Sequence, residues 1–127
     1  MKKKKYHILI VDDDRQLRIA LEKVLIKSGY AISTAPNGIE AWEMVAEKDF
    51  DLVISDIRMP EKGGIELLSN IKKYKPNIPV IVMTAFGEPL SYHQAIENGA
   101  REYIHKPIKK DDMLKIVHHI LNEGAAI

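Results

Sequence analysis

The apolar positions of this chain follow two different spacings. Runs of consecutive apolar residues, which are typical of strands buried on both faces, occur at 8–11, 52–55 and 79–83, and weaker extended stretches lie at 30–35 and 102–105. Between them, apolar residues recur at i, i+3, i+4 and i+7, the spacing of a helix with one inward face. This second pattern predicts helices over about 17–25, 39–48, 67–74, 88–98 and 113–121.

Strands and helices that alternate in this way predict one parallel sheet. Strand–helix–strand units of this length need right-handed crossovers, which place helices on both faces of the sheet. The first, third and fourth strands are continuously apolar and belong in the middle, whereas the second and fifth are weaker and belong at the edges. We therefore predict an α/β fold whose five-stranded parallel sheet has the order 2-1-3-4-5.

Composition narrows the class of protein without identifying a partner. The 127 residues fit a single domain, 1–127, with a basic N-terminal extension at 1–5 and a C-terminal tail at 122–127. The formal net charge of +1 gives no overall attraction to nucleic acid or membrane, and no run approaches the ~20 apolar residues that span a bilayer. Cysteine is absent, which excludes a disulfide framework and favours a cytoplasmic location.

Residues suited to phosphate or metal chemistry follow the apolar runs. Asp12 and Asp13 follow the first, Asp56 the third, Thr84 the fourth and Lys106 the fifth. The carboxyl ends of parallel strands lie along one edge of a sheet, so we expect these side chains to meet. The three carboxylates would repel one another unless a cation lay between them, and oxygen ligands suit Mg²⁺, with Mn²⁺ as a substitute.

The same residues form a complete set for making an acyl phosphate. A carboxylate can be the nucleophile in phosphoryl transfer if the charge on the transferred group is neutralised. Lys106 offers a point positive charge and Thr84 offers a hydroxyl donor. Asp14 has a different role, because its position predicts the N-cap of the first helix.

Several short motifs in this order resemble the receiver domain of bacterial two-component response regulators. The resemblance runs from Ile8 to about Leu121 and includes a chemotaxis-regulator-like, flavodoxin-like (βα)5 fold. The matching pieces are Asp12-Asp13, the Asp-x-x-Met-Pro stretch from Asp56 to Pro60, Gly64, Thr84-Ala85, Gly99-Ala100 and Lys106-Pro107.

The resemblance assigns roles to the residues at the strand ends. It implies that Asp56 is the phosphoacceptor and that Asp13, Asp56 and the backbone carbonyl of Arg58 bind Mg²⁺, with Asp12 acting mainly through water. Lys106 and Thr84 would contact the phosphoryl group. Tyr103 matches the aromatic position that turns inward in this family when the threonine is drawn to the phosphate.

Two further positions concern the lifetime of the phosphorylated form. Arg58 and Phe86 lie two residues beyond the phosphoacceptor and two beyond the threonine. The resemblance implies that side chains at these positions would flank the route of a hydrolytic water. Both are bulky. We expect them to restrict this water and to slow self-dephosphorylation.

These features predict a phosphorylation-controlled signalling switch and not an enzyme. The switch would catalyse only its own phosphorylation and dephosphorylation. A histidine kinase or phosphotransfer protein would supply the phosphoryl group, and the surface of the fourth helix, fifth strand and fifth helix would control an output domain or partner protein. We expect no direct binding of nucleic acid and no membrane contact by this domain. A phosphorylation-dependent homodimer is left open.

Two other classes of protein share part of the pattern. Asp12-x-Asp14 imitates the signature of haloacid-dehalogenase phosphatases, but Gln16 replaces the expected hydroxyl residue. A flavodoxin-like binding module would need a hydroxyl- or glycine-rich phosphate loop where this chain has three aspartates. The chain ends soon after the last predicted helix, so we expect no effector domain in it; a stand-alone receiver and a piece of a larger regulator, such as an enhancer-binding activator, both fit.

Overall fold

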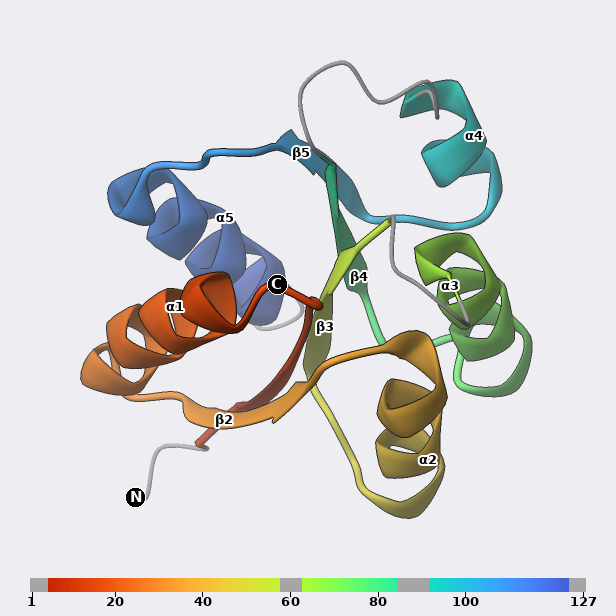
Figure 1. Ribbon diagram of the computed structural model, residues 1–127, viewed down its shortest axis with the longest axis horizontal. Coiled ribbons are helices and arrows are strands. Elements are labelled where there is room, and N and C mark those ends of the chain that lie inside the picture. The colour runs from red at the N-terminus through yellow and green to blue at the C-terminus, as the bar shows by residue number, and fades with distance from the viewer. Residues whose placement is uncertain (1–4, 58–62, 85–91, 124–127) are drawn as a thin grey trace.

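The computed structural model describes residues 5–57, 63–84 and 92–123. Strands and helices alternate, and the five parallel strands are ordered β2-β1-β3-β4-β5, as predicted (Figure 1). In chain order the elements are β1 (His7–Val11), α1 (Arg15–Lys27), β2 (Ala31–Ala35), α2 (Gly38–Glu47), β3 (Leu52–Asp56), α3 (Gly64–Tyr74), β4 (Val80–Thr84), α4 (Tyr92–Glu97), β5 (Glu102–His105) and α5 (Lys110–Glu123).

Helices cover both faces of the sheet. Figure 1 shows α1 and α5 on one side and α2, α3 and α4 on the other. Alternate residues of β1 divide between the two cores, because Ile8 and Ile10 pack with α1 and α5 while Leu9 and Val11 pack with α2 and α3. The central strands are thus buried on both faces, which explains their continuous apolar sequence.

The strand register brings the carboxyl ends together. Val11 of β1 pairs with Ser55 of β3, and Asp56 pairs with Met83 of β4. At the other edge, Thr84 of β4 pairs with His105 of β5. The residues that close or follow these strands therefore lie along one edge of the sheet.

The first helix begins where the sequence predicts. Asp14 is its N-cap, and its carboxylate accepts hydrogen bonds from the amides of Gln16 at 3.0 Å and Leu17 at 3.2 Å. The helix is followed by Gly29, whose φ of 98° lies in the left-handed region that favours glycine.

The third and fourth helices differ from the others in how far the structure matches the prediction. The predicted apolar stripe of the third helix includes Tyr74, but this side chain is 59% exposed. Tyr74 lies in the last turn of α3. Its ring packs beside that of Trp42 on α2, with ring centroids 5.8 Å apart, and does not enter the core. The first part of the predicted fourth helix, 88–91, lies outside the described residues.

No helix in the described ranges is long and apolar enough to cross a membrane.

Candidate functional site

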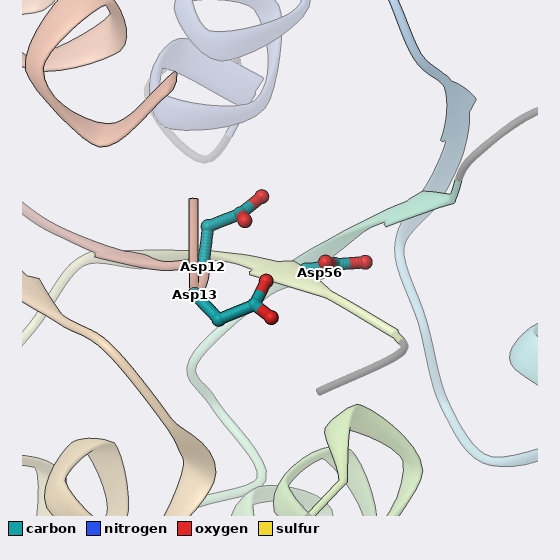
Figure 2. Close-up of side chains that lie close together, drawn as sticks. All are labelled: Asp12, Asp13 and Asp56. Atoms are coloured by element: carbon teal, nitrogen blue, oxygen red, sulfur yellow. The ribbon is translucent and has the colours of Figure 1, made fainter. Parts of the chain in front are cut away.

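Three aspartates meet at the carboxyl edge of the sheet. Asp12 and Asp13 directly follow β1, and Asp56 is the last residue of the neighbouring strand β3 (Figure 2). One carboxylate oxygen from each lies within 4.8 Å of the others. Asp12 and Asp56 are buried and Asp13 is exposed, so the cluster opens to solvent on the side of Asp13.

Lys106 joins two of these carboxylates. Its ammonium nitrogen Nζ lies 2.7 Å from Oδ2 of Asp12 and 3.2 Å from Oδ2 of Asp56. The lysine follows β5 and is fixed there because its backbone amide donates to the carbonyl oxygen of Thr84 at 2.7 Å. The peptide bond to Pro107 is cis. The fold therefore brings together the four charged side chains that the sequence predicts at this edge, namely Asp12, Asp13, Asp56 and Lys106.

Burial and ion pairing act in opposite directions on the pKa values of Asp12 and Lys106. It raises the pKa of the Asp12 carboxyl, although hydrogen bonds from Lys106 and the Asp14 amide act in the opposite direction. Burial lowers the pKa of the Lys106 ammonium, but its hydrogen bonds with and attraction to Asp12 and Asp56 outweigh burial and leave that pKa above its usual value. An ion pair alone would lower the pKa of Asp12; the rise follows because this side chain is 0% exposed.

The three carboxylates differ in how firmly they are held. Oδ1 of Asp12 accepts the backbone amide of Asp14 at 2.9 Å, and Oδ2 accepts Lys106, so both of its oxygens have partners. By contrast, no hydrogen bond or ion pair within the described ranges reaches the carboxylate of Asp13. Asp13 is thus the most accessible of the three for an added ligand.

The chemistry of this cluster fits a hard divalent cation. Three carboxylates within 4.8 Å supply oxygen ligands and an excess of negative charge that one lysine does not neutralise. Mg²⁺ is commonly bound by one or two carboxylates together with water and phosphate oxygens. Because both oxygens of Asp12 already accept hydrogen bonds whereas Asp13 is exposed, Asp13 is better placed than Asp12 for direct ligation.

The two predicted readout residues lie on adjacent strands. Thr84 ends β4 and is 0% exposed, whereas Tyr103 of β5 is half-buried against the core on the side of α2 and α3. The Tyr103 ring meets that of His105 edge to face, with centroids 5.3 Å apart. The coupling of Tyr103 to Thr84 stays a prediction. Arg58 and Phe86 lie outside the described residues, so the predicted carbonyl ligand and the water-access role are not placed.

Sequence reasoning missed two residues beside the site. Arg18 of α1 donates from Nη1 to the backbone carbonyl of Asp12 at 2.6 Å. Ser55 is buried, and its hydroxyl donates to the backbone carbonyl of Asp56 at 3.0 Å. One sequence feature could have pointed to Arg18: it is a positively charged residue near the start of a helix, where the helix dipole disfavours positive charge.

Gly64 shows why a glycine follows the loop beyond Asp56. A Cβ atom there would collide with the carbonyl oxygen of Asp56 and would lie 2.9 Å from the carbonyl carbon of Ile57. Both obstacles are backbone atoms, which cannot turn aside as a side chain can. The close approach is fixed by a hydrogen bond from the Gly64 amide to the Ile57 carbonyl at 3.1 Å.

We expect Gly64→Ala to lower the free energy of unfolding by about 1–3 kcal/mol, the usual effect of overpacking. The adjacent Gly63 is the matched control, because a Cβ there would meet nothing within 4 Å and its φ of −73° suits any residue. Gly63 is the N-cap of α3, where alanine is less favourable than glycine, so Gly63→Ala should cost about 0.5–1 kcal/mol, less than Gly64→Ala. Urea unfolding of both variants measures the difference; equal effects would contradict the close-approach explanation.

Comparison with known proteins places this fold and site in one family. The family model described as "Response regulator receiver domain" matches residues 8–118. The transcriptional regulatory protein ZraR of Klebsiella oxytoca is 44% identical over 106 residues, which cover 84% of this chain and 24% of ZraR. The DNA-binding transcriptional regulator NtrC of Azospirillum brasilense is 36% identical over 117 residues, which cover 92% of this chain and 24% of NtrC.

A solved structure agrees with the sequence matches. The receiver domain protein (CheY-like) from Methanospirillum hungatei JF-1 superposes with a TM-score of 0.90 at 29% identity, and the match covers 94% of this chain and 96% of that one. The fold and site define a signalling domain of the chemotaxis-regulator-like, flavodoxin-like class. The chain belongs to the response regulator receiver domain family of two-component signalling. It spans about a quarter of the length of the curated relatives.

Proposed function

We propose that this domain accepts a phosphoryl group on Asp56 from a histidine kinase or phosphotransfer protein, with Mg²⁺ bound beside it. The observation that carries the proposal is the cluster itself: three carboxylates within 4.8 Å of one another, two of them joined by Lys106. Asp56 is the acceptor because Oδ2 of its buried carboxylate contacts the Lys106 ammonium, one of its oxygens lies within 4.8 Å of an Asp13 oxygen, and a carboxylate can attack a phosphorus atom.

The transfer forms a bond between an Asp56 oxygen and phosphorus and breaks the bond between phosphorus and the donor's leaving group. Asp13, Asp56 and the Arg58 carbonyl would hold Mg²⁺, with Asp12 reaching it through water. The cation, which Mn²⁺ can replace, supplies neutralisation of the charge on the transferred oxygens. Lys106 exchanges its contact with the Asp56 carboxylate for a phosphoryl oxygen, and the Thr84 hydroxyl donates to another.

Phosphorylation then shifts a two-state equilibrium. The Thr84 hydroxyl moves toward the phosphoryl group and Tyr103 turns inward, which alters the surface formed by α4, β5 and α5. That surface would contact an output domain, a partner protein or a second copy of the domain. Bulky Arg58 and Phe86 would restrict water and lengthen the life of the phosphorylated form.

The receiver is a switch that catalyses only its own phosphorylation and dephosphorylation, in the cytoplasm, with no contact of its own with nucleic acid or membrane. We take 1–127 as a single receiver domain with a basic extension at 1–5 and a tail at 122–127. Because the similar proteins are transcriptional regulators about four times as long, the domain fits the receiver part of such a regulator. A stand-alone receiver would act instead on a separate protein.

The direct test uses acetyl phosphate as a small phosphoryl donor. With Mg²⁺ present, we expect intact-mass spectrometry to show addition of one phosphoryl group, and borohydride trapping followed by peptide mapping to place it on Asp56. Chelation of the metal should prevent the addition. Modification that needs no divalent cation, or that maps to a residue other than Asp56, would contradict the proposal.

A further inference from the structure

Arg18 lies at an unfavourable place for a cation, and this calls for an explanation. It is in the first turn of α1, which begins at Arg15, and the N-terminal end of a helix carries partial positive charge. Its side chain is half-buried and turns back toward the start of the helix, where Nη1 donates to the backbone carbonyl of Asp12 at 2.6 Å. The contact therefore links the helix to the loop that carries the acidic cluster.

The bonded carbonyl belongs to the peptide that joins Asp12 to Asp13. A planar peptide that is held at its oxygen also fixes the direction in which the next residue leaves it. This matters for Asp13, because its carboxylate has no hydrogen bond or ion pair in the described part of the chain. Asp12 differs, since the Asp14 amide and Lys106 hold both of its oxygens.

Arg18 connects α1 to the loop that follows β1, through its hydrogen bond to the Asp12 carbonyl. The Asp12 amide donates to Ala35 of β2 at 3.2 Å, and the Arg18 amide donates to the Asp14 carbonyl at 3.0 Å. Asp14 caps α1 through its side chain. The sheet therefore holds Asp12 through its amide and α1 holds it through its carbonyl, so that Arg18 fixes the oxygen of the peptide before Asp13.

We propose that Arg18 is a positioning residue for the metal site: it holds the Asp12–Asp13 peptide so that the Asp13 carboxylate stays beside Asp56, where the three carboxylates gather (Figure 2). The inference rests on the proposed function, because it deepens the role of the same site. Residues that orient metal ligands typically contribute 10- to 100-fold to metal affinity.

The test measures divalent-cation binding, with Mg²⁺ by calorimetry and Mn²⁺ by electron paramagnetic resonance. Arg18→Met keeps most of the aliphatic stem but removes the donor, and we expect it to raise the Kd for both cations by about 10- to 100-fold. Arg18→Lys retains the positive charge and a donor group and should restore part of the affinity. Arg15→Met is the matched control: it removes a positive charge from the same helical turn, and the exposed Arg15 side chain makes no hydrogen bond in the described ranges.

A loss of affinity confined to Arg18→Met, with partial rescue by lysine, would support positioning. The Mg²⁺ concentration for half-maximal phosphorylation by acetyl phosphate should rise, while the rate at saturating Mg²⁺ should change much less. An unchanged Kd in Arg18→Met, or an equal rise in Arg15→Met, would overturn the inference. If Arg18→Met does not fold, Arg18→Leu, which also lacks a donor, replaces it, with a raised Kd supporting the inference and an unchanged Kd overturning it.

Measurements on the wild-type protein distinguish a failure of the proposed function from a failure of the proposed role of Arg18. Failure of the wild type to bind Mg²⁺ or to take up phosphate on Asp56 would contradict the proposed function itself. Normal behaviour of the wild type together with an unaffected Arg18→Met would leave that function intact and remove only the role of Arg18.

Discussion

Asp56→Asn should abolish phosphate uptake from acetyl phosphate in the presence of Mg²⁺. Asparagine has nearly the same shape, so packing at the end of β3 is kept, but its amide oxygen is a far weaker nucleophile than a carboxylate. Lys106 retains its shorter contact, at 2.7 Å, with Asp12. Intact-mass spectrometry over a time course should therefore show no addition of a phosphoryl group above the level seen without metal.

The substitution should not unfold the protein, because it removes one of three mutually repelling carboxylates. Urea unfolding without metal is thus expected to show unchanged or greater stability, which separates lost chemistry from lost structure. Asp14→Asn is the matched control in the same region: asparagine caps a helix about as well as aspartate, so phosphorylation should continue. Uptake by Asp56→Asn at the wild-type rate would show that another residue accepts the phosphate.

The sheet and the meeting of its polar ends could be predicted because both depend on local pattern. Continuous apolar runs identify strands buried on two faces, and the family of parallel folds then allows few strand orders. Once β1 and β3 are neighbours, Asp12 and Asp56 have to lie close together. The strand order therefore determines where the site lies.

Contacts that depend on the exact path of the chain could not be predicted. The motif marked Gly64 but gave no reason for it, because the obstacle is the backbone of Asp56 and Ile57, eight and seven positions earlier in the chain. Arg18 escaped notice because its partner is a backbone carbonyl, which every residue possesses. Tyr74 continued a helical stripe in the sequence, yet the stripe extends past the core that it was expected to enter.

Lys106→Met is expected to destabilise the metal-free protein strongly at neutral pH. Lysine is the cation that the structure places between Asp12 and Asp56, whose side chains are 0% and 9% exposed. Removing one partner of a buried ion pair commonly lowers the free energy of unfolding by 3–5 kcal/mol, and because the Lys106 side chain is 22% exposed we expect a smaller loss of roughly 2 kcal/mol. Exposed Lys109 provides the control, and Lys109→Met should change stability by less than about 0.5 kcal/mol.

The loss should shrink as the pH falls. The pKa of Lys106 is raised in the folded protein, so its contribution is fully present below the usual lysine value of 10.5 and is lost only as the pH rises through the folded pKa. Burial raises the pKa of Asp12 above 3.8, and removing the lysine raises it further, so folded Lys106→Met binds more protons than its unfolded form just above pH 3.8. Acidification therefore stabilises the variant relative to wild type. Urea unfolding in a chelator at pH 7 and at pH 4 measures the effect, and a stability difference that is the same at both would contradict this explanation.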